Sequence, residues 1–506
     1  MQFNVVKNAK KNLSFGIVNR FILLVCPFIE RIVINNVLGA QYLGLGSLFV
    51  SVLNVLALSE LGFSTAMVYN MFKPAGEKDT VRMNALLNYY KRVYRMIGSI
   101  ILAVGLVLIP FLPRLIKDSY PQDINLTYLY LIYLSNTAVS YFLFAYRESL
   151  LVVHQRDDVR SFIHSIVKIV MTGLQIAALF LTKNYYYFAL LMLLATVINN
   201  LWVNFRVRAL YPQYQPRGKL SDDDRAEIRK LVSGTFIQQA CTVTRNSLDS
   251  IFISAYLGLT MTGIYNNYYL ILNGVTTFTG LVTAAFTGGV GNHVAMRDPE
   301  QNYQEMKRLD FVYLWLGGWC AISMLCLYQP FVTLWMGKDM LLPDSAALLM
   351  CLYFYLLKLG DMRFMYTTAT GLWWEQRYRA IGETAVNVIL NIILGKYFGV
   401  HGIILATMLS LFACNYLWAS HITFRLYFTL KRLWDYYRYQ AVESAFVFAA
   451  AAVTWLICVK LPVHDALPAF LLRAVVCVIV PNALFVLVYH RTAMFKYALN
   501  AIRRRK

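Results

Sequence analysis

Residues 30–44 read ERIVINNVLGAQYLG, and residues 249–263 read DSIFISAYLGLTMTG. The two stretches share the pattern I-x-I-x3-L-G-x4-G at an offset of 219 residues. The same offset aligns residues 30–98 with residues 249–317 without a gap, and 12 of these 69 pairs are identical. The shared glycines predict a turn between two apolar helices in each copy. An internal duplication therefore organises the chain.

The repeat extends beyond this pattern. Asp79 and Asp298 occupy equivalent positions in a loop, and Tyr94 and Tyr313 occupy equivalent positions in a helix. Lys78-Asp79 corresponds to Arg297-Asp298, and after a two-residue shift Gln155-Arg156 corresponds to Gln376-Arg377. Six predicted helices separate the copies, and an even number inserts both in the same orientation. The sequence thus predicts a parallel duplication with two pseudo-symmetric lobes.

The composition indicates that the chain folds in a membrane. The chain has 506 residues, of which 58% are hydrophobic and 14% charged, whereas soluble domains carry about 25% charged residues. The apolar residues gather in blocks of about 20, the length of a helix that crosses ~30 Å of hydrocarbon. We predict an all-α membrane protein with about fourteen transmembrane helices, at residues 13–34, 41–70, 84–113, 124–146, 158–182, 184–205, 232–257, 262–290, 309–337, 343–371, 379–398, 401–424, 439–459 and 466–489.

The distribution of basic residues predicts the topology. The net charge is +21, and with a cytoplasmic N-terminus 31 of the 47 Lys and Arg residues fall in or beside inner loops, whereas 6 fall in outer loops. Basic residues resist translocation, so both termini are expected in the cytoplasm. No basic patch is combined with a soluble recognition fold, so we expect no nucleic-acid partner. The first block is long and contains Arg20, Glu30 and Arg31, which indicates a retained helix and not a signal peptide.

The predicted organisation has four parts. An N-lobe covers residues 1–210, a cytoplasmic linker 211–231, a C-lobe 232–428, and two further helices with a basic cytoplasmic tail 429–506. In the linker, Ser221 with the acidic residues behind it predicts the N-cap of a short amphipathic helix that leads into the seventh span.

Charges inside the predicted spans are the candidate functional residues. A charge at the bilayer centre costs ~2.5–3.5 kcal/mol on insertion scales, so it normally faces a partner or water. Basic groups suit a phosphate-bearing substrate, because they neutralise charge where water is scarce. We expect the following residues to line a substrate cavity between the lobes: Arg20, Glu60, Lys168, Arg245, Asp249, Asp361 and Arg363.

Several structural alternatives stay open for these and other residues. Arg245 and Asp249 stand at i, i+4 and could neutralise each other. Arg31 near the outer end could extend to the interface. Gln155, Arg156, Gln376 and Arg377 are candidates for an inner gate, or for contacts with lipid heads. Tyr265, Tyr268 and Tyr269 could stack on sugar rings or pack between helices. All eight cysteines lie in predicted helices without paired metal spacing, which favours a packing role, and we expect no metal site.

The chain resembles the polysaccharide-repeat (Wzx-type) flippases of the multidrug/oligosaccharidyl-lipid/polysaccharide (MOP) exporter superfamily. The resemblance covers nearly the whole chain. The residues that carry it are Lys11-Asn12, Gly16, Leu38-Gly39, Gly44, Leu58-Ser-Glu-Leu-Gly62, Phe72-Lys-Pro, Gln155-Arg156, Asp249 to Gly258 and Gly371-Leu-Trp.

This resemblance implies fourteen helices, a V-shaped pair of lobes as in MATE transporters and lipid II flippases, a cationic cavity and alternating access. It implies that undecaprenyl diphosphate-linked oligosaccharide is moved from the inner to the outer leaflet of a bacterial plasma membrane for surface polysaccharide biosynthesis. In related lipid II flippases the last two helices form a groove for the lipid tail, so residues 439–489 are expected to do the same. Arg473 departs from a purely apolar groove.

The alternatives to this function fall into three classes. A multidrug or cation antiporter and a lipid II flippase belong to the same superfamily. A membrane polysaccharide polymerase or glycosyltransferase is disfavoured, because the outer loops are short and no H-E-x-x-H, G-x-S-x-G or G-x4-G-K-[ST] motif is present. A scaffold for sugar assembly is disfavoured by the charges within the spans. We therefore predict a secondary transporter and no enzyme. It would have no cofactor, its coupling would be to the membrane potential, H⁺ or Na⁺, and its partners would be membrane lipids and polysaccharide assembly proteins.

Overall fold

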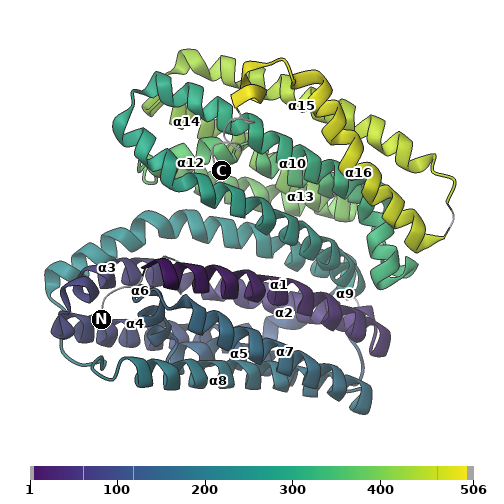
Figure 1. Ribbon diagram of the computed structural model, residues 1–506. Helices are drawn as coiled ribbons and strands as arrows, with labels where there is room; N and C mark the ends of the chain where they lie inside the picture. Colours follow the sequence, from purple (N-terminus) through teal and green to yellow (C-terminus); the bar gives the residue numbers. More distant parts are fainter. Residues whose placement is uncertain (1–4, 61, 118, 464, 498–506) are drawn as a thin grey trace. The chain divides into compact units, whose positions relative to one another are not determined.

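The computed structural model describes residues 5–60, 62–117, 119–463 and 465–497 (Figure 1). No β-strand occurs in these ranges. The helices are α1 (Val5–Val37), α2 (Ala40–Leu56), α3 (Phe63–Glu77), α4 (Thr80–Leu108), α5 (Leu126–Phe142), α6 (Glu148–Val153), α7 (Asp157–Thr182), α8 (Tyr185–Leu210), α9 (Asp222–Met296), α10 (Pro299–Met336), α11 (Asp344–Lys358), α12 (Asp361–Ala369), α13 (Arg377–Ser410), α14 (Ala419–Leu426), α15 (Leu430–Val459) and α16 (Ala466–Tyr489). The shorter helical segments are η1 (Ala57–Glu60), η2 (Ile109–Leu115), η3 (Ala145–Arg147), η4 (Lys338–Met340) and the π-helical η5 (Leu411–Trp418). The predicted all-α class is confirmed.

The helices form two compact units. Unit 1 is Met1–Gly263 and unit 2 is Ile264–Lys506, so the division falls inside α9. The lobe, linker and C-terminal boundaries drawn from the repeat stay predictions.

Unit 1 is built around α2, α5 and α7. α1 packs along α7, α7 packs on α8, and α5 lies against both α4 and α8. Leu45, Leu48 and Phe49 of α2 are fully buried. The Phe49 ring meets the rings of Tyr130 and Tyr133 edge-on, with centroids 5.4 Å apart in both pairs. Such aromatic pairs contribute about 0.5–1.5 kcal/mol beyond the area they bury, so they help to fix α5 against α2.

Unit 2 is built around α10, which packs against α11, α15 and α16 (Figure 1). Trp315 of α10 stacks on Phe485 of α16 with centroids 4.2 Å apart. Its indole nitrogen donates to Asn482 at 2.9 Å. The last two helices are therefore an integral part of unit 2.

The predicted glycine turns are present in both copies of the repeat. Gly39 between α1 and α2 has φ 106° and ψ 172°, and Gly258 inside α9 has φ 86° and ψ 177°. A β-carbon would make this backbone conformation unfavourable, so glycine is required. Gly44 has a second constraint, because a Cβ there would lie 1.8 Å from the carbonyl oxygen of Leu259. The repeated pattern thus encodes the break between two helices in each copy.

The repeated aspartates are helix caps. Asp79 accepts a hydrogen bond from the backbone N–H of Arg82 at 2.9 Å, at the start of α4. Asp298 accepts from the N–H of Gln301 at 2.8 Å, at the start of α10. Each carboxylate satisfies a backbone donor that the helix leaves unpaired. The sequence identity at these positions therefore has a structural cause.

Nine helical segments within the described ranges are long and apolar enough to cross a membrane, and a bent pair that ends at Val153 raises the number to ten. Two of the nine each join two predicted blocks, across Gly258 in α9 and across Gly399 in α13. The first two predicted blocks lie on α1 and on α2 with α3. The chain is a multi-pass membrane protein, and the count of fourteen spans stays a prediction.

The first part of the linker, residues 211–220, is hydrogen-bonded to α4. The side-chain oxygen of Asn84 accepts from the backbone N–H of Gln215 at 2.7 Å. The amide of Asn88 donates to the carbonyl oxygen of Gly218, also at 2.7 Å. These bonds hold the linker against the beginning of α4.

Ser221 caps α9 as predicted. Its hydroxyl accepts from the N–H of Asp224 at 3.1 Å and donates to the Asp224 carboxylate at 2.7 Å. The same carboxylate pairs with Arg82 at 2.6 Å. The helix that begins here continues into the next apolar segment without a break before Gly258, so it is longer than the short helix that was predicted.

Candidate functional site

Arg20 lies within the apolar part of α1, and its side chain is exposed. Its neighbours Ile17, Val18 and Phe21 are exposed as well. Among the residues that the structure describes, no hydrogen bond or ion pair involves Arg20. An uncompensated guanidinium within a membrane helix is costly unless it meets water or an anion. The predicted role of Arg20 in a substrate cavity stays a prediction.

Lys168 of α7 is paired with Glu30 of α1. The ammonium lies 2.5 Å from a Glu30 carboxylate oxygen, and the hydroxyl of Thr172 donates to the same oxygen at 2.6 Å. Lys168 and Thr172 are one helical turn apart on α7, which brings both to the same carboxylate. The sequence analysis placed Lys168 among the residues expected to line a substrate cavity. The structure shows instead a neutral ion pair between two packed helices.

Arg245 and Asp249 lie one turn apart in the first part of α9, and both are buried. The Arg245 Nε donates to the Asn246 side-chain oxygen at 3.3 Å. Asp249 is equivalent to Glu30 in the repeat. The repeat thus brings a carboxylate to the corresponding helix in both copies, partly buried at Glu30 and buried at Asp249.

Glu60 accepts hydrogen bonds from two tyrosines of unit 1. It ends η1, and Gly62 in the left-handed conformation follows before α3 begins. The phenol of Tyr94 donates to one carboxylate oxygen and that of Tyr141 to the other, both at 2.5 Å. Tyr90 in turn donates to the Tyr94 oxygen at 3.0 Å. The break between α2 and α3 places this carboxylate against α4 and α5, where phenols satisfy it.

In unit 2, Tyr313, the repeat equivalent of Tyr94, binds the carboxylate of Asp361. Tyr313 donates to it at 2.5 Å, and the ammonium of Lys358 lies 3.0 Å from the same oxygen. The Lys358 side chain is 5% exposed and that of Asp361 is 30% exposed. A buried cation is thereby neutralised by a partly exposed carboxylate.

Arg363, two residues further along α12, is almost completely buried. One of its terminal nitrogens donates to the backbone carbonyl of Asn415 at 2.8 Å. The buried Nε has no acceptor among the described groups. The geometry therefore gives Arg363 a position in the interior of unit 2.

The first pair of predicted gate residues is held within unit 1. The Asn12 amide donates to the carbonyl oxygen of Gln155 at 3.1 Å, and its oxygen accepts from the N–H of Asp158 at 2.8 Å. Arg156 donates to both Asp158 carboxylate oxygens, at 2.9 and 3.2 Å. These hydrogen bonds hold the pKa of Arg156 above its ordinary value. The side chain of Gln155 is exposed, so it is the freer of the two.

The second pair lies in unit 2. Gln376 is buried, and its amide lies 3.4 Å from the Thr423 hydroxyl, to which it donates. The Arg377 guanidinium lies over the rings of Trp374 and Tyr378, 4.1 and 4.3 Å from their centroids. Cation–π contacts of this kind contribute about 0.5–1 kcal/mol at exposed sites. A gating role for the four residues stays a prediction.

Two of the tyrosines considered for sugar stacking are buried. Tyr265 and Tyr268 are at most 1% exposed. The phenol of Tyr268 accepts from the N–H of Leu342 at 3.2 Å and donates to Gln329. These contacts support the packing interpretation for Tyr268.

An apolar cavity of about 700 Å³ lies in unit 2, lined by α10, α11, α15 and a single residue of α16. Ala321, Leu325, Leu348 and Ala451 contribute apolar surface, and Arg473 is the basic residue in the lining. The cavity thus borders the last two helices, where the resemblance predicts a groove for a lipid tail.

Sequence reasoning missed the tyrosine donors at both carboxylates. One tyrosine donor in each unit could have been found from the sequence, because Tyr94 and Tyr313 are identical across the repeat. Tyr141 and Thr172 carried no comparable signal, since their contacts depend on how helices far apart in the sequence pack.

Long apolar helices, a repeated glycine turn and charges paired inside the helices characterise a multi-pass membrane protein. Among solved structures, the chain is similar to the lipid II flippase MurJ in an inward-closed conformation, with a TM-score of 0.67 and 16% identity over 94% of this chain and 99% of that one. It is also similar to an inward-facing multidrug resistance MATE family transporter of the MOP superfamily, with a TM-score of 0.61 and 15% identity over 82% of this chain and 98% of that one. A mutant of the Vibrio cholerae MATE transporter VcmN gives a TM-score of 0.56 and 11% identity over 83% and 96% of the two chains.

At these identities the likeness establishes the fold. The chain has the fold shared by the lipid II flippase and the MATE transporters. No protein-family model matches the chain, and neither does any curated protein. The narrower resemblance to Wzx-type flippases stays a prediction.

Proposed function

We propose that this chain is a secondary transporter that flips a polyprenyl diphosphate-linked oligosaccharide from the inner to the outer leaflet by alternating access. The similar solved structure whose match covers 94% of this chain is that of a lipid II flippase, which is consistent with a lipid-linked cargo. We further propose that the protein acts in the bacterial plasma membrane, with both termini in the cytoplasm, in surface polysaccharide biosynthesis.

Arg20 carries the proposal. It is an exposed guanidinium in the apolar part of α1, which the sequence predicts to span the membrane, and it has no ion pair in the described part of the chain. A diphosphate offers several acceptor oxygens to a planar guanidinium, and such charge-assisted hydrogen bonds are about twice as strong as neutral ones. Arg20 would therefore bind the head group more strongly than it interacts with water.

Lys168 would contribute through an exchange of partners. In the structure its charge is neutralised by Glu30 at 2.5 Å. A diphosphate that reaches this pair would compete with Glu30 for the ammonium, and protonation or Na⁺ binding at Glu30 would favour that exchange. The ion gradient or the membrane potential would then set the direction of transport.

The lipid tail would occupy the apolar cavity of unit 2. A volume of about 700 Å³ accommodates only part of a polyprenyl chain, so the rest would lie in the surrounding membrane. This assignment follows the groove that the resemblance predicts.

A flipping assay tests the proposal. The purified chain is reconstituted in vesicles with a fluorescent undecaprenyl diphosphate-linked sugar, and the loss of accessible label in one leaflet is followed. Arg20→Ala should reduce the rate at least tenfold, and Arg20→Lys should retain part of it because the charge remains. The matched control is Arg217→Ala, which removes an exposed arginine of the linker, outside the predicted spans. Equal rates in Arg20→Ala and the control would refute the role of Arg20.

A cation antiporter is the second candidate, and Glu60 favours it. The partners that the structure gives this carboxylate are phenols, so its negative charge is not compensated by a described basic group. An organic cation or a proton could bind there. Proton-driven uptake of a fluorescent cation, abolished by Glu60→Gln and unaffected by Arg20→Ala, would support this function over lipid flipping.

A further inference from the structure

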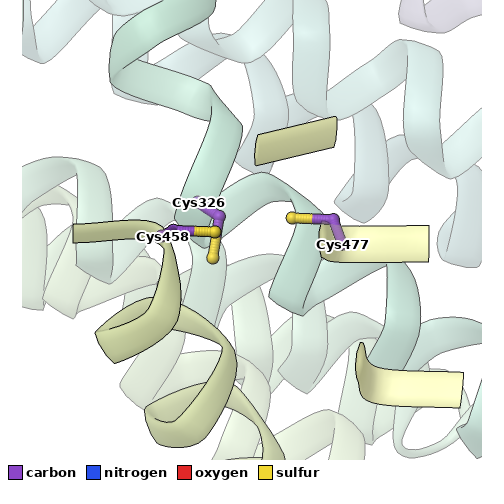
Figure 2. A group of neighbouring side chains, drawn as sticks. All are labelled: Cys326, Cys458 and Cys477. Carbon is purple, nitrogen blue, oxygen red and sulfur yellow. The ribbon is translucent and has the colours of Figure 1, made fainter. Parts of the chain in front are cut away.

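Three cysteines from three different helices meet in the interior of unit 2. They are Cys326 of α10, Cys458 of α15 and Cys477 of α16, and their Sγ atoms all lie within 4.8 Å of one another. The residues are 4%, 2% and 1% exposed. Figure 2 shows the thiol of Cys477 directed toward the other two. This cluster could not be predicted from the sequence, because its members are 132 and 19 positions apart.

A positive charge without a described counter-ion lies next to the cluster. Arg473 stands one helical turn before Cys477 on α16, and its charge acts on both Cys326 and Cys458. Its Nε is buried and has no acceptor within the described ranges, which also place no carboxylate at ion-pair distance from the guanidinium. Three neutral thiols give this cation no compensation, whereas thiolates would.

We propose that the three cysteines bind a thiophilic divalent cation of the Zn²⁺ or Cd²⁺ type. Binding would release the three thiol protons, and three thiolates with one divalent ion carry a net charge of minus one. The guanidinium of Arg473 would balance that charge, so the complete site would be neutral within the membrane.

The geometry is close to what the metal requires. A Zn–S distance of about 2.3 Å in a tetrahedral site places the sulfurs about 3.8 Å apart. The present separations therefore need a contraction of at most about 1 Å, which rotation of the cysteine side chains can supply. The fourth ligand position has access to solvent molecules or a ligand, because Cys326 and Arg473 both line the apolar cavity of unit 2.

The cation would connect three helices at one point. α10 is the central helix of unit 2, and α15 and α16 are the last two helices of the chain. A ligand that binds the folded arrangement and not the separated helices stabilises the fold by mass action. Metal binding would thus fasten α15 and α16 to α10 beside the cavity.

Cadmium is the probe for this site. The purified full-length chain, reduced in detergent, is titrated with Cd²⁺, and the thiolate-to-metal charge-transfer absorption is recorded. We expect one Cd²⁺ per chain, and loss of this absorption in Cys326→Ala, Cys458→Ala and Cys477→Ala. Cys351→Ala is the matched control, because Cys351 is equally buried and lines the same cavity but lies outside the cluster. Arg473→Gln should weaken binding by about tenfold.

A second measurement needs no variant. Wild-type protein is unfolded in the presence of a thiol-alkylating reagent, with and without Cd²⁺, and the modified cysteines are identified by mass spectrometry. Slower alkylation of these three cysteines alone would support the site. Equal Cd²⁺ binding by Cys326→Ala and Cys351→Ala, no binding by the wild type, or a Cys326–Cys458 disulfide that persists in the isolated protein under mild reduction would overturn it.

Discussion

Glu60 in unit 1 and Asp361 in unit 2 are both bound by a tyrosine at the same position of the repeat, but their charges are compensated differently. Tyr94 donates to Glu60 and Tyr313 donates to Asp361, each at 2.5 Å. The second donor to Glu60 is the neutral phenol of Tyr141. The second partner of Asp361 is the ammonium of Lys358 at 3.0 Å.

The carboxylate has changed helices between the two copies. Thr279 occupies the position equivalent to Glu60, whereas Asp361 falls at the position equivalent to residues 140–142, close to Tyr141. The duplicated scaffold has kept the phenol and has taken the acid from a different neighbouring helix. Unit 2 thereby holds a neutral ion pair, and unit 1 holds a carboxylate among phenols. Unit 1 thus has a carboxylate that no basic group among the described residues neutralises.

Removing the cation of unit 2 should have the largest effect. Lys358→Met leaves Asp361 with its phenol partner alone, and loss of one partner of a buried pair costs about 3–5 kcal/mol. Because Asp361 is 30% exposed, we expect about 3 kcal/mol, the lower end of that range. Unfolding in detergent by a chemical denaturant measures it. The double variant Lys358→Met with Asp361→Asn should recover most of the stability, and an unchanged single variant would refute the contrast between the units.

Removing the repeated phenol should affect the two units unequally. Tyr94→Phe takes away one of two donors to Glu60 and the partner of Tyr90, so a loss of about 2 kcal/mol is expected. Tyr313→Phe leaves Asp361 with Lys358, and about 1 kcal/mol is expected. Both variants are compared in the same unfolding assay. A larger loss for Tyr313→Phe would reverse the proposed difference.

The helix caps should behave alike in the two copies. Asp79→Ala and Asp298→Ala each remove an N-cap acceptor, at a cost of about 1 kcal/mol. Asp→Asn at each position is the control, because asparagine caps about as well as aspartate. Equal losses would show that the scaffold, unlike the carboxylate sites, is symmetric, whereas a difference above 1 kcal/mol would contradict this.

The smallest effect is expected from pH, and in unit 1 only. The His154 ring packs at a tilt against those of Tyr211 and Tyr214, with centroids 4.4 and 5.5 Å away, and burial lowers its pKa from 6.5. The stability contributed by the neutral imidazole is present above pH 6.5 and is lost as the pH falls through the lowered pKa. The hydrogen-exchange protection factors of residues 211–218, which correct for slower intrinsic exchange at low pH, should decrease from about pH 7 to about pH 5. The equivalent position in unit 2 is the exposed Glu375, where no such change is expected.

Much of the scaffold could be predicted from the sequence, because its determinants are local. Each determinant lies within one turn of the chain that it shapes. The determinants are a glycine at positive φ, an aspartate three residues before its N–H donor, and Ser221 before three acidic residues. The repeat doubled the evidence for the first two. Helix boundaries inside α9 and α13 could be predicted as well, since a glycine interrupts each apolar run.

The partners of the charged residues could not be predicted. Lys168 and Glu30 are 138 residues apart, and Tyr141 and Glu60 are 81 apart. Such contacts depend on which faces of the helices pack together. The sequence shows that a charge lies in a predicted span, but it does not show whether that charge has a partner. It therefore does not distinguish the paired Lys168 from the exposed Arg20.

The continuity of α9 limits where the chain can change in length. From the Ser221 cap to Gly258 the helix has no break, so each inserted or deleted residue would rotate everything after it by about 100°. Arg245 and Asp249 would then turn away from their present surroundings. The loop before Ser221 is not helical, so a change in its length does not rotate the residues that follow. Its two hydrogen bonds to α4 nevertheless hold it in place. Natural relatives and engineered fusions should therefore differ in length before Ser221 and keep the spacing after it.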